Sequence, residues 1–284
     1  MIPTRGRLAA LVAEGGALLE KSGSPTPELE SQLLLAHVLG TERSKMLVDP
    51  PDEIPADAPG CFRGLLERRA AGEPLFYITG SKGFHNHVFN VNSSVLVPRP
   101  ETEEMVEAVL ERFSNERPLA VADVGTGSGC IAVTLGLERP SWRIKAVDVS
   151  EDALSVAREN ARRLGAANVS FARSDLLSGV RGLFDVVVSN PPYVDFALSG
   201  ALQVEVRKYE PSVALFADEN GLGGIRELVA QSARRLRTGG TFFCEIGFDQ
   251  KDAVSKFFDP AVWSDVEFIR DLAGHDRVAT ADKK

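Results

Sequence analysis

The chain has 284 residues, of which 44% are hydrophobic and 25% are charged, values typical of folded globular proteins. They exclude the disordered, collagen-like and coiled-coil classes, and the length favours about two domains. Asp and Glu (40) outnumber Lys and Arg (32), so the net charge is −8 and we expect no direct nucleic-acid binding through an extended basic surface.

The cysteines Cys61, Cys130 and Cys244 stand far apart and beside apolar residues. They fit neither a disulfide framework nor a zinc site, which favours a reducing cytoplasm as the location. Glu14 interrupts the first apolar stretch, so we interpret it as a helix rather than a signal peptide. No apolar run reaches the ~18 residues that span a bilayer, and we expect no membrane partner.

Residues 1–73 are predicted to form a small N-terminal helical domain. Thr26 as N-cap and Pro27 at the first helical position predict a helix start, and Gly40 ends that helix. A further helix is expected over residues 58–71. A bundle of this size beside a larger domain is often a binding module for a partner protein, although its composition does not name one.

Residues 74–97 change to a period of two and predict a β-hairpin linker that turns near Asn86 and His87. His85 and His87 are a conceivable metal pair. Because no third ligand is recognisable nearby, we expect a solvated hairpin and no metal.

Residues 98–284 alternate apolar strands with helices. Strands are predicted at 121–124, 144–147, 169–171, 184–188 and 242–246, and helices at 130–137, 153–164, 225–236 and 249–258. Such alternation requires parallel pairing through right-handed crossovers, so we predict a doubly wound, Rossmann-like α/β domain. The runs at 266–269 and 278–280 are expected to complete one edge, with an antiparallel strand.

The turn after the first of these strands has glycine at every second position. It reads Asp123, Val124, Gly125, Thr126, Gly127, Ser128, Gly129. Glycines let the backbone bend and let a ligand approach closely. Cys130 stands where a dinucleotide fingerprint needs glycine, and an acidic residue two positions before the first glycine suits the cationic S-adenosylmethionine. A tight turn without a ligand remains the alternative.

Two carboxylates follow the next strands. Asp148 ends the second strand, where a carboxylate can accept hydrogen bonds from both ribose hydroxyls; helix capping is the alternative. Asp175 follows the third strand and could reach an adenine amino group, with Ser174 and Leu176 beside the ring. Helix capping explains Asp175 equally well.

The segment Asn190, Pro191, Pro192, Tyr193 follows the strand at 184–188, and two prolines there predict a rigid loop. If the strand order reverses between the first and fourth strands, this loop faces the glycine turn. The side-chain oxygen of Asn190 and the carbonyl oxygen of Pro191 could then accept both hydrogens of a planar NH2 group during methyl transfer. Tyr193 would supply a flat wall against the substrate.

These residues, with several longer stretches, resemble the release factor glutamine N5-methyltransferases. The stretches are Glu73-Pro74-Leu75, Tyr77-Ile78-Thr79-Gly80, Val97-Pro98-Arg99-Pro100-Glu101-Thr102-Glu103, Tyr209-Glu210-Pro211, Glu245-Ile246-Gly247 and Asp276-Arg277-Val278. The resemblance implies methylation, with S-adenosylmethionine as donor, of the glutamine in the Gly-Gly-Gln loop of bacterial-type peptide chain release factors. It also implies that the N-terminal domain helps to hold the release factor, that Gly125 to Gly129, Asp148 and Asn190 bind the cofactor, and that Asn190 to Tyr193 bind the glutamine.

Three alternatives remain at this level. An adenine N6-methyltransferase of DNA uses a similar loop, some relatives act on a ribosomal protein, and a protein that only binds the cofactor would have no need of the loop. Arg99, Glu205 and Glu245 receive no role, because caps and ion pairs explain them equally well. Residues 194–220 lack clear periodicity, which indicates either a lid over the substrate or a mobile segment, and we expect them to become ordered with the substrate.

Overall fold

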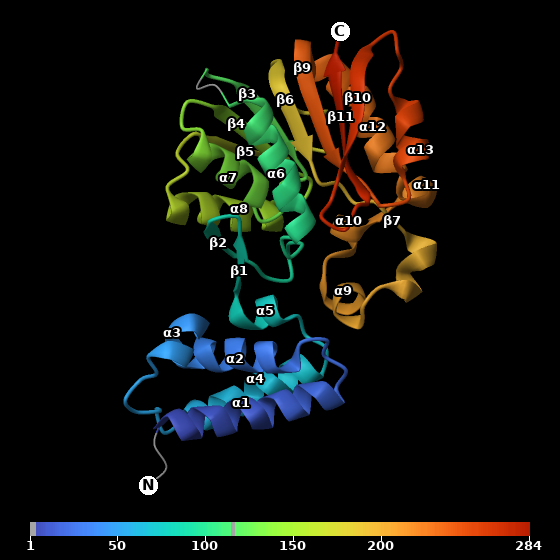
Figure 1. Cartoon of the computed structure of the whole chain (residues 1–284). Helices are drawn as coiled ribbons and strands as arrows, with labels where there is room; N and C mark the ends of the chain where they lie inside the picture. Colours follow the sequence, from blue (N-terminus) through green and yellow to red (C-terminus); the bar gives the residue numbers. More distant parts are fainter. Residues whose placement is uncertain (1–3, 115–116) are drawn as a thin grey trace. The chain divides into compact units, whose positions relative to one another are not determined.

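The computed structural model describes residues 4–114 and 117–284, and the chain divides into two compact units. The first unit comprises Met1–Gly80 and Val204–Tyr209, and the second comprises Ser81–Gln203 and Glu210–Lys284. The chain therefore crosses between the units more than once, because six residues from the second half of the sequence belong to the helical unit (Figure 1). Along the described ranges, no helix has both the length and the apolar character needed to cross a membrane.

The first unit is helical, as predicted. Its helices are α1 (Thr4–Lys21), α2 (Pro27–Val38), α3 (Arg43–Val48), α4 (Ala58–Ala70), α5 (Leu75–Thr79) and α9 (Val204–Tyr209). Leu19, Leu34 and Phe62 are fully buried between α1, α2 and α4. Gly15 permits this close packing, because a Cβ atom there would lie 2.4 Å from Ser31 Oγ.

Two details of this unit differ from the sequence prediction. Thr26 precedes α2, but its side chain makes no capping hydrogen bond, because its ψ of 58° is not the extended conformation from which such side chains reach the first turn. The segment after Pro74 forms α5 rather than extended structure. Leu75 and Ile78, three residues apart, bury one helical face in the core of the first unit.

The predicted hairpin is present and belongs to the second unit. Strands β1 (Ser81–Phe84) and β2 (His87–Asn90) pair antiparallel, with Phe84 opposite His87. The turn therefore lies at 85–86, one residue earlier than predicted, and His85 adopts a positive φ of 53°. Phe84 and Phe89 are buried in the main core and contact each other edge to face, so the hairpin is packed rather than only a linker.

The second unit contains the predicted doubly wound sheet. Its strands are β3 (Ala120–Val124), β4 (Arg143–Asp148), β5 (Val169–Arg173), β6 (Phe184–Ser189), β9 (Leu236–Glu245), β10 (Trp263–Arg270) and β11 (Asp276–Lys283). Their order across the sheet is β10-β11-β9-β6-β3-β4-β5, and β11 is antiparallel to both of its neighbours. The first and fourth parallel strands, β3 and β6, are adjacent. The predicted reversal of strand order and the antiparallel edge are therefore confirmed.

Both faces of this sheet are buried. Val121 and Val186 point into one core and Ala122 and Val187 into the other, as the period of two in strands requires. Figure 1 shows the helices over these faces. The first core includes residues of α6 (Pro100–Arg112), α7 (Cys130–Glu138) and α8 (Glu151–Leu164), and the second includes residues of α12 (Gly223–Arg235) and α13 (Lys251–Val254). The helix predicted over 249–258 is thus shorter, and a 3₁₀ turn continues it.

The aperiodic segment 194–220 contains several very short elements. In the second unit these are β7 (Val194–Asp195), the 3₁₀ helix η1 (Phe196–Ala201), α10 (Ser212–Leu215), β8 (Phe216–Ala217) and α11 (Asp218–Gly221). Strands β7 and β8 pair in parallel, and the rings of Phe196 and Phe216 pack edge to face beside them. Elements of two to six residues are too short to produce a readable period.

Candidate active site

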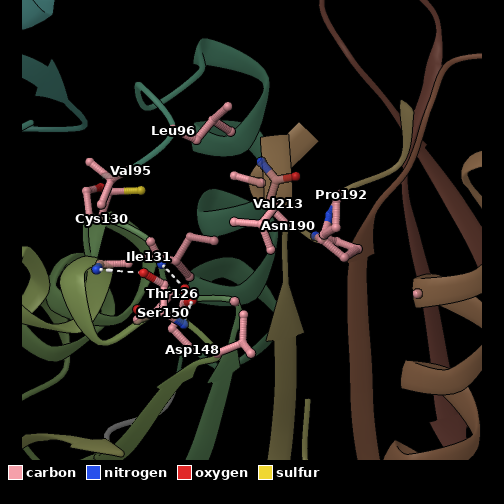
Figure 2. Close-up of a pocket in the computed structure, with 18 of the residues that line it drawn as sticks. Val95, Leu96, Thr126, Cys130, Ile131, Asp148, Ser150, Asn190, Pro192 and Val213 are labelled. Atoms are coloured by element: carbon pink, nitrogen blue, oxygen red, sulfur yellow. Dashed lines mark hydrogen bonds between the residues drawn. The ribbon is translucent and has the colours of Figure 1, made fainter. Parts of the chain in front are cut away.

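A cavity of about 320 Å³ lies at the carboxyl ends of the central strands, within the second unit. Figure 2 shows Thr126, Asp148 and Ser150 lining one part of it and Asn190 and Pro192 another. Most of the residues proposed from the sequence line this cavity, namely Gly125, Thr126, Gly127, Ser128, Asp148, Asp175, Leu176, Asn190, Pro191 and Pro192. Its volume lies within the range of small-molecule sites.

The glycine turn and the proline loop meet because of strand register. Val124 pairs with Ser189 across the parallel strands β3 and β6, so Gly125 and Asn190 each follow one member of that pair. A Cβ atom on Gly125 would lie 3.9 Å from the carbonyl oxygen of Asn190. Two motifs about 60 residues apart thereby line one site, as expected where strand order reverses.

Three proposed residues, Asp123, Gly129 and Tyr193, lie outside the cavity lining. The carboxylate of Asp123 is fully buried and accepts hydrogen bonds from Thr126 Oγ1 at 2.6 Å and from the backbone N–H of Ala132 at 3.2 Å. Burial raises the pKa of Asp123 to about 7. Asp123 thus holds the turn to α7 from beneath.

Gly129 shapes the turn through close packing. Its φ is +82°, a conformation that costs other residues energy, and a Cβ atom there would lie 3.1 Å from Ala157 Cβ on α8. Asn160, also on α8 and fully buried, donates to the carbonyl oxygen of Ser128 at 2.9 Å. Helix α8 therefore supports the end of the turn.

Asp148 faces the cavity from the end of β4. Its Oδ2 accepts from the backbone N–H of Gly127 and its Oδ1 from that of Ser150, both at 2.9 Å. These bonds fix the carboxylate plane, and each oxygen retains a lone pair for a further donor. Such a carboxylate can receive two neighbouring hydroxyl groups.

Apolar side chains complete this part of the cavity. Ile131, Val149 and Leu176 line it beside Asp175. Leu176 has a positive φ of 46°, which is uncommon for a residue with a branched side chain and indicates that the surrounding structure holds it there. The combination suits a flat, weakly polar ring with an amino group at its edge.

Asn190 is held by a short chain of hydrogen bonds. Its Nδ2 donates to Thr102 Oγ1 at 2.9 Å, and Thr102 Oγ1 donates to Glu245 Oε2 at 2.6 Å. The other oxygen of Glu245 accepts from the hydroxyl of Tyr193 at 3.1 Å. Since the nitrogen of the Asn190 amide is bound to Thr102, its oxygen is the atom that remains to accept a hydrogen bond in the cavity.

Glu245 is buried, with 1% of its surface exposed. Burial raises its pKa to about 7, and burial followed by the charge of Glu245 also raises the pKa of Tyr193. Sequence reasoning left Glu245 without a role and missed the side-chain contacts of Thr102. An acidic residue at the end of the apolar run 242–246 is the signal that could have indicated a buried, hydrogen-bonded carboxylate.

The two other unassigned residues have separate positions. Arg99 lines the cavity and donates to both carboxylate oxygens of the buried Glu210, at 2.7 and 2.8 Å. Glu205 lies in α9 and pairs with Arg69 inside the helical unit, so it does not belong to the cavity. The sequence also contained no signal for Val213 and Phe216, which line the cavity from the short elements after α9.

Both parts of the chain match known protein families. The PrmC N-terminal domain matches residues 10–80, and the methyltransferase small domain matches residues 102–204. The release factor glutamine methyltransferase of Koribacter versatilis (strain Ellin345) is 41% identical over 267 residues, which cover 93% of this chain and 94% of that protein. The chain belongs to the release factor glutamine methyltransferase family. The relative from Neisseria gonorrhoeae (strain ATCC 700825 / FA 1090) carries the same name and is 42% identical over 90% of this chain and 93% of its own length.

The fold of this chain is also similar to that of solved structures with low sequence identity. A crystal structure of a methyltransferase from Pyrococcus furiosus superimposes with a TM-score of 0.53 at 21% identity, covering 69% of this chain and 88% of that one. At that identity the match supports the fold alone. Together with the family membership it confirms the predicted Rossmann-like methyltransferase domain.

As a member of this methyltransferase family, the chain uses S-adenosylmethionine. The cavity lining fits that cofactor on three grounds. Gly125 and Gly127, at φ of +72° and +55°, leave no side chain in the way of a close approach. Asp148 presents a fixed carboxylate for hydroxyl groups, and Ile131, Val149 and Leu176 present apolar surface for a ring.

Proposed function

We propose that this protein transfers a methyl group to the side-chain nitrogen, N5, of the glutamine in the Gly-Gly-Gln motif of peptide chain release factors. The observation that carries the proposal is the orientation of Asn190. Its amide nitrogen is engaged by Thr102, which leaves the amide oxygen to accept from a substrate NH2 group in the cavity that Asp148 and the glycine turn also line. Relatives at 41% identity with the name release factor glutamine methyltransferase support the choice of substrate.

The difficulty of the reaction explains why such acceptors are needed. The nitrogen of a carboxamide is a poor nucleophile because its lone pair is delocalised into the carbonyl group. Two fixed acceptors, Asn190 Oδ1 and the carbonyl oxygen of Pro191, would take the two N–H groups and orient the lone pair. They also stabilise the positive charge that grows on nitrogen in the transition state.

When bound, S-adenosylmethionine supplies a methyl group attached to a positively charged sulfur. We assign to this chain the task of holding the two reactants in line. Gly125 to Gly129 and Asp148 would hold the cofactor, with Asp175 and Leu176 at its adenine, and Asn190 to Tyr193 would hold the glutamine. Asp123 would hold the glycine turn in place through its hydrogen bonds to Thr126 and Ala132. Formation of the new N–C bond would break the bond between the methyl carbon and sulfur and leave a neutral thioether, and one N–H proton would leave to water after the transfer.

The atom that receives the methyl group distinguishes this proposal from its alternatives. The protein is incubated with methyl-labelled S-adenosylmethionine and, in parallel, a release factor, the same factor with its motif glutamine replaced by alanine, large-subunit ribosomal proteins, and duplex DNA that contains adenine. Labelled products are digested and mapped. We expect label on one glutamine of the unaltered release factor. Label on adenine or on a ribosomal protein at a comparable rate would overturn the assignment.

In the same experiment, the variant Asn190→Ala tests the role of Asn190 in methyl transfer. We expect turnover to fall by at least ~10², the loss typical of one preorganised polar contact, while cofactor affinity changes by less than about tenfold. Turnover equal to that of the wild type would remove Asn190 from the chemistry.

A further inference from the structure

A chain of hydrogen bonds behind Asn190 connects three separate elements. Thr102 lies in the first turn of α6, Asn190 follows β6, and Glu245 ends β9. The distances along the chain are 2.9 Å from Asn190 Nδ2 to Thr102 Oγ1 and 2.6 Å from Thr102 Oγ1 to Glu245 Oε2. Thr102 is 2% exposed and Glu245 1% exposed, so water does not compete for these bonds.

The direction of each bond follows from the chemistry of the groups. Above about pH 7 the buried Glu245 is ionised and can only accept, so it takes the single hydroxyl hydrogen of Thr102. The oxygen of Thr102 can then only accept from Asn190, and an amide offers hydrogen from its nitrogen alone. The oxygen of Asn190 is therefore turned away from Thr102. Rotating the amide by half a turn would place two acceptors against each other at Thr102.

That rotation would also place an NH2 group of the enzyme against an NH2 group of the substrate. Two donors facing each other cannot form a hydrogen bond, and the positive charge growing on the substrate nitrogen would be destabilised. We infer that Thr102 and Glu245 are positioning residues that hold the Asn190 carboxamide with its oxygen towards the substrate nitrogen. This inference rests on the proposed function.

Glu245 restrains the loop at both ends. One carboxylate oxygen acts on Asn190 through Thr102, and the other binds the hydroxyl of Tyr193, three residues further along. Gln250 adds a third restraint, because its Nε2 donates to the carbonyl oxygen of Tyr193 at 2.9 Å. Pro191 and Pro192, between these anchors, have no freedom in φ. The backbone acceptor at Pro191 is therefore held by the same carboxylate that orients Asn190.

The test compares Thr102→Val with Thr102→Ser. Valine keeps the shape of threonine and removes the hydroxyl, whereas serine keeps the hydroxyl and removes a methyl group. We expect Thr102→Val to lower kcat for a release factor by about 10- to 100-fold, with KM and the cofactor Kd changed by less than about threefold. Thr102→Ser is expected to retain kcat within about threefold of the wild type.

A purely structural role of Thr102 predicts a different ranking, because the serine variant leaves a buried void of one methyl group and the valine variant leaves none. Equal losses in both variants, or a wild-type kcat in Thr102→Val, would overturn the inference. Glu245→Gln supplies a second measurement. Its single amide oxygen can accept from only one of the two hydroxyls, so we expect a drop in kcat, and wild-type kcat would count against the inference.

Two further measurements keep this inference separate from the proposed function. In an Asn190→Ala background, Thr102→Val should change kcat by less than about twofold, because Thr102 acts through Asn190. A full additional loss would mean that it acts elsewhere. The methylated atom is mapped in the wild type first: a label that is not on glutamine overturns the proposed function, whereas label on glutamine with an unaffected Thr102→Val overturns only the positioning role.

Discussion

Individual buried carboxylates organise the two halves of the site. Asp123 lies under the glycine turn and Glu245 behind the proline loop, and neither lines the cavity. Burying a charge is costly unless hydrogen bonds compensate it, and each carboxylate accepts two of them. Burial raises the pKa of both groups to about 7. The stability of the site therefore depends on pH in the neutral range.

Asp123 allows the sign of this dependence to be tested. Its pKa is raised from 3.8 to about 7 by burial, so between these values the folded state keeps a proton that the unfolded state has lost. The contribution of Asp123 to the free energy of unfolding therefore falls as pH rises, and the full penalty is present above about pH 7. Asp123→Asn lacks this titration. We expect its free energy of unfolding, relative to the wild type, to increase by roughly 2 kcal/mol from about pH 5 to about pH 8.

The measurement is urea unfolding of both proteins across that pH range. Glu267→Gln, which neutralises an exposed carboxylate on β10, is the matched control and should follow the wild type. A difference between Asp123→Asn and the wild type that stays constant with pH would contradict the prediction, whatever its absolute size.

At the scale of elements, α8 and the hairpin support the glycine turn. Asn160 on α8 donates to the carbonyl oxygens of Ser128 and Asn90 and accepts from the N–H of Asn90. One buried amide thus connects the glycine turn, a helix and β2. The approach of α8 depends on the missing side chain at Gly129, so helix packing and turn geometry are a single requirement.

A pair of glycine substitutions separates packing from backbone strain. Gly129 and Gly165 share a φ of +82°, but a Cβ atom would lie 3.1 Å from Ala157 in the first case and meets nothing within 4 Å in the second. We expect Gly165→Ala to lower the free energy of unfolding by about 1 kcal/mol from strain alone. Gly129→Ala should cost at least ~1 kcal/mol more and also weaken cofactor binding, because α8 must move.

Thermal unfolding and calorimetric titration with S-adenosylmethionine provide the two measurements. Gly165→Ala is the control for cofactor binding, because Gly165 caps the C-terminal end of α8 and lies far along the chain from the glycine turn. Equal losses of stability in the two variants, with unchanged cofactor Kd, would show that the close approach of α8 to Gly129 contributes neither to stability nor to cofactor binding.

At the scale of the whole molecule, the segment Val204–Tyr209 belongs to the helical unit although the residues on both sides of it belong to the other unit. Arg69 is central to this arrangement. It is 9% exposed, donates to both oxygens of Glu30 at 2.9 and 3.0 Å, and contacts Glu205 of α9 at 2.5 Å. A guanidinium in this position satisfies two carboxylates from different parts of the chain.

Removal of that guanidinium tests the attachment of α9. Arg69→Met leaves two carboxylates without their partner, and breaking a buried ion pair in this way typically costs about 3–5 kcal/mol. We expect lower thermal stability and faster tryptic cleavage after the exposed Arg207 and Lys208. Arg63→Met is the control, because Arg63 and Glu14 form an exposed pair at 3.5 Å whose loss should cost less than ~1 kcal/mol. Cleavage at the wild-type rate in Arg69→Met would contradict the prediction.

Much of the fold could be predicted because its signals are local. The apolar strands, the helices between them and the glycines of the turn each reflect rules that act over a few residues. The errors of the prediction are each confined to a short segment. The segment 75–79 forms a helix through the burial of Leu75 and Ile78 in a core built by α1, α2 and α4, and the hairpin turn lies one residue earlier than the pattern indicated. In the segment 75–79, contacts with distant residues outweigh a weak local preference.

The sequence alone determined the doubly wound sheet and the positions of its two motifs, because a strand that ends in glycines or prolines can be recognised without its neighbours. Only the tertiary structure decided which atom of Asn190 faces the cavity. That choice depends on Thr102 and Glu245, which lie 88 and 55 residues away in the chain and reach Asn190 only through the pairing of β9 with β6 and the packing of α6. A hydrogen-bond direction is a property of three groups in contact, and no pattern within one segment contains it.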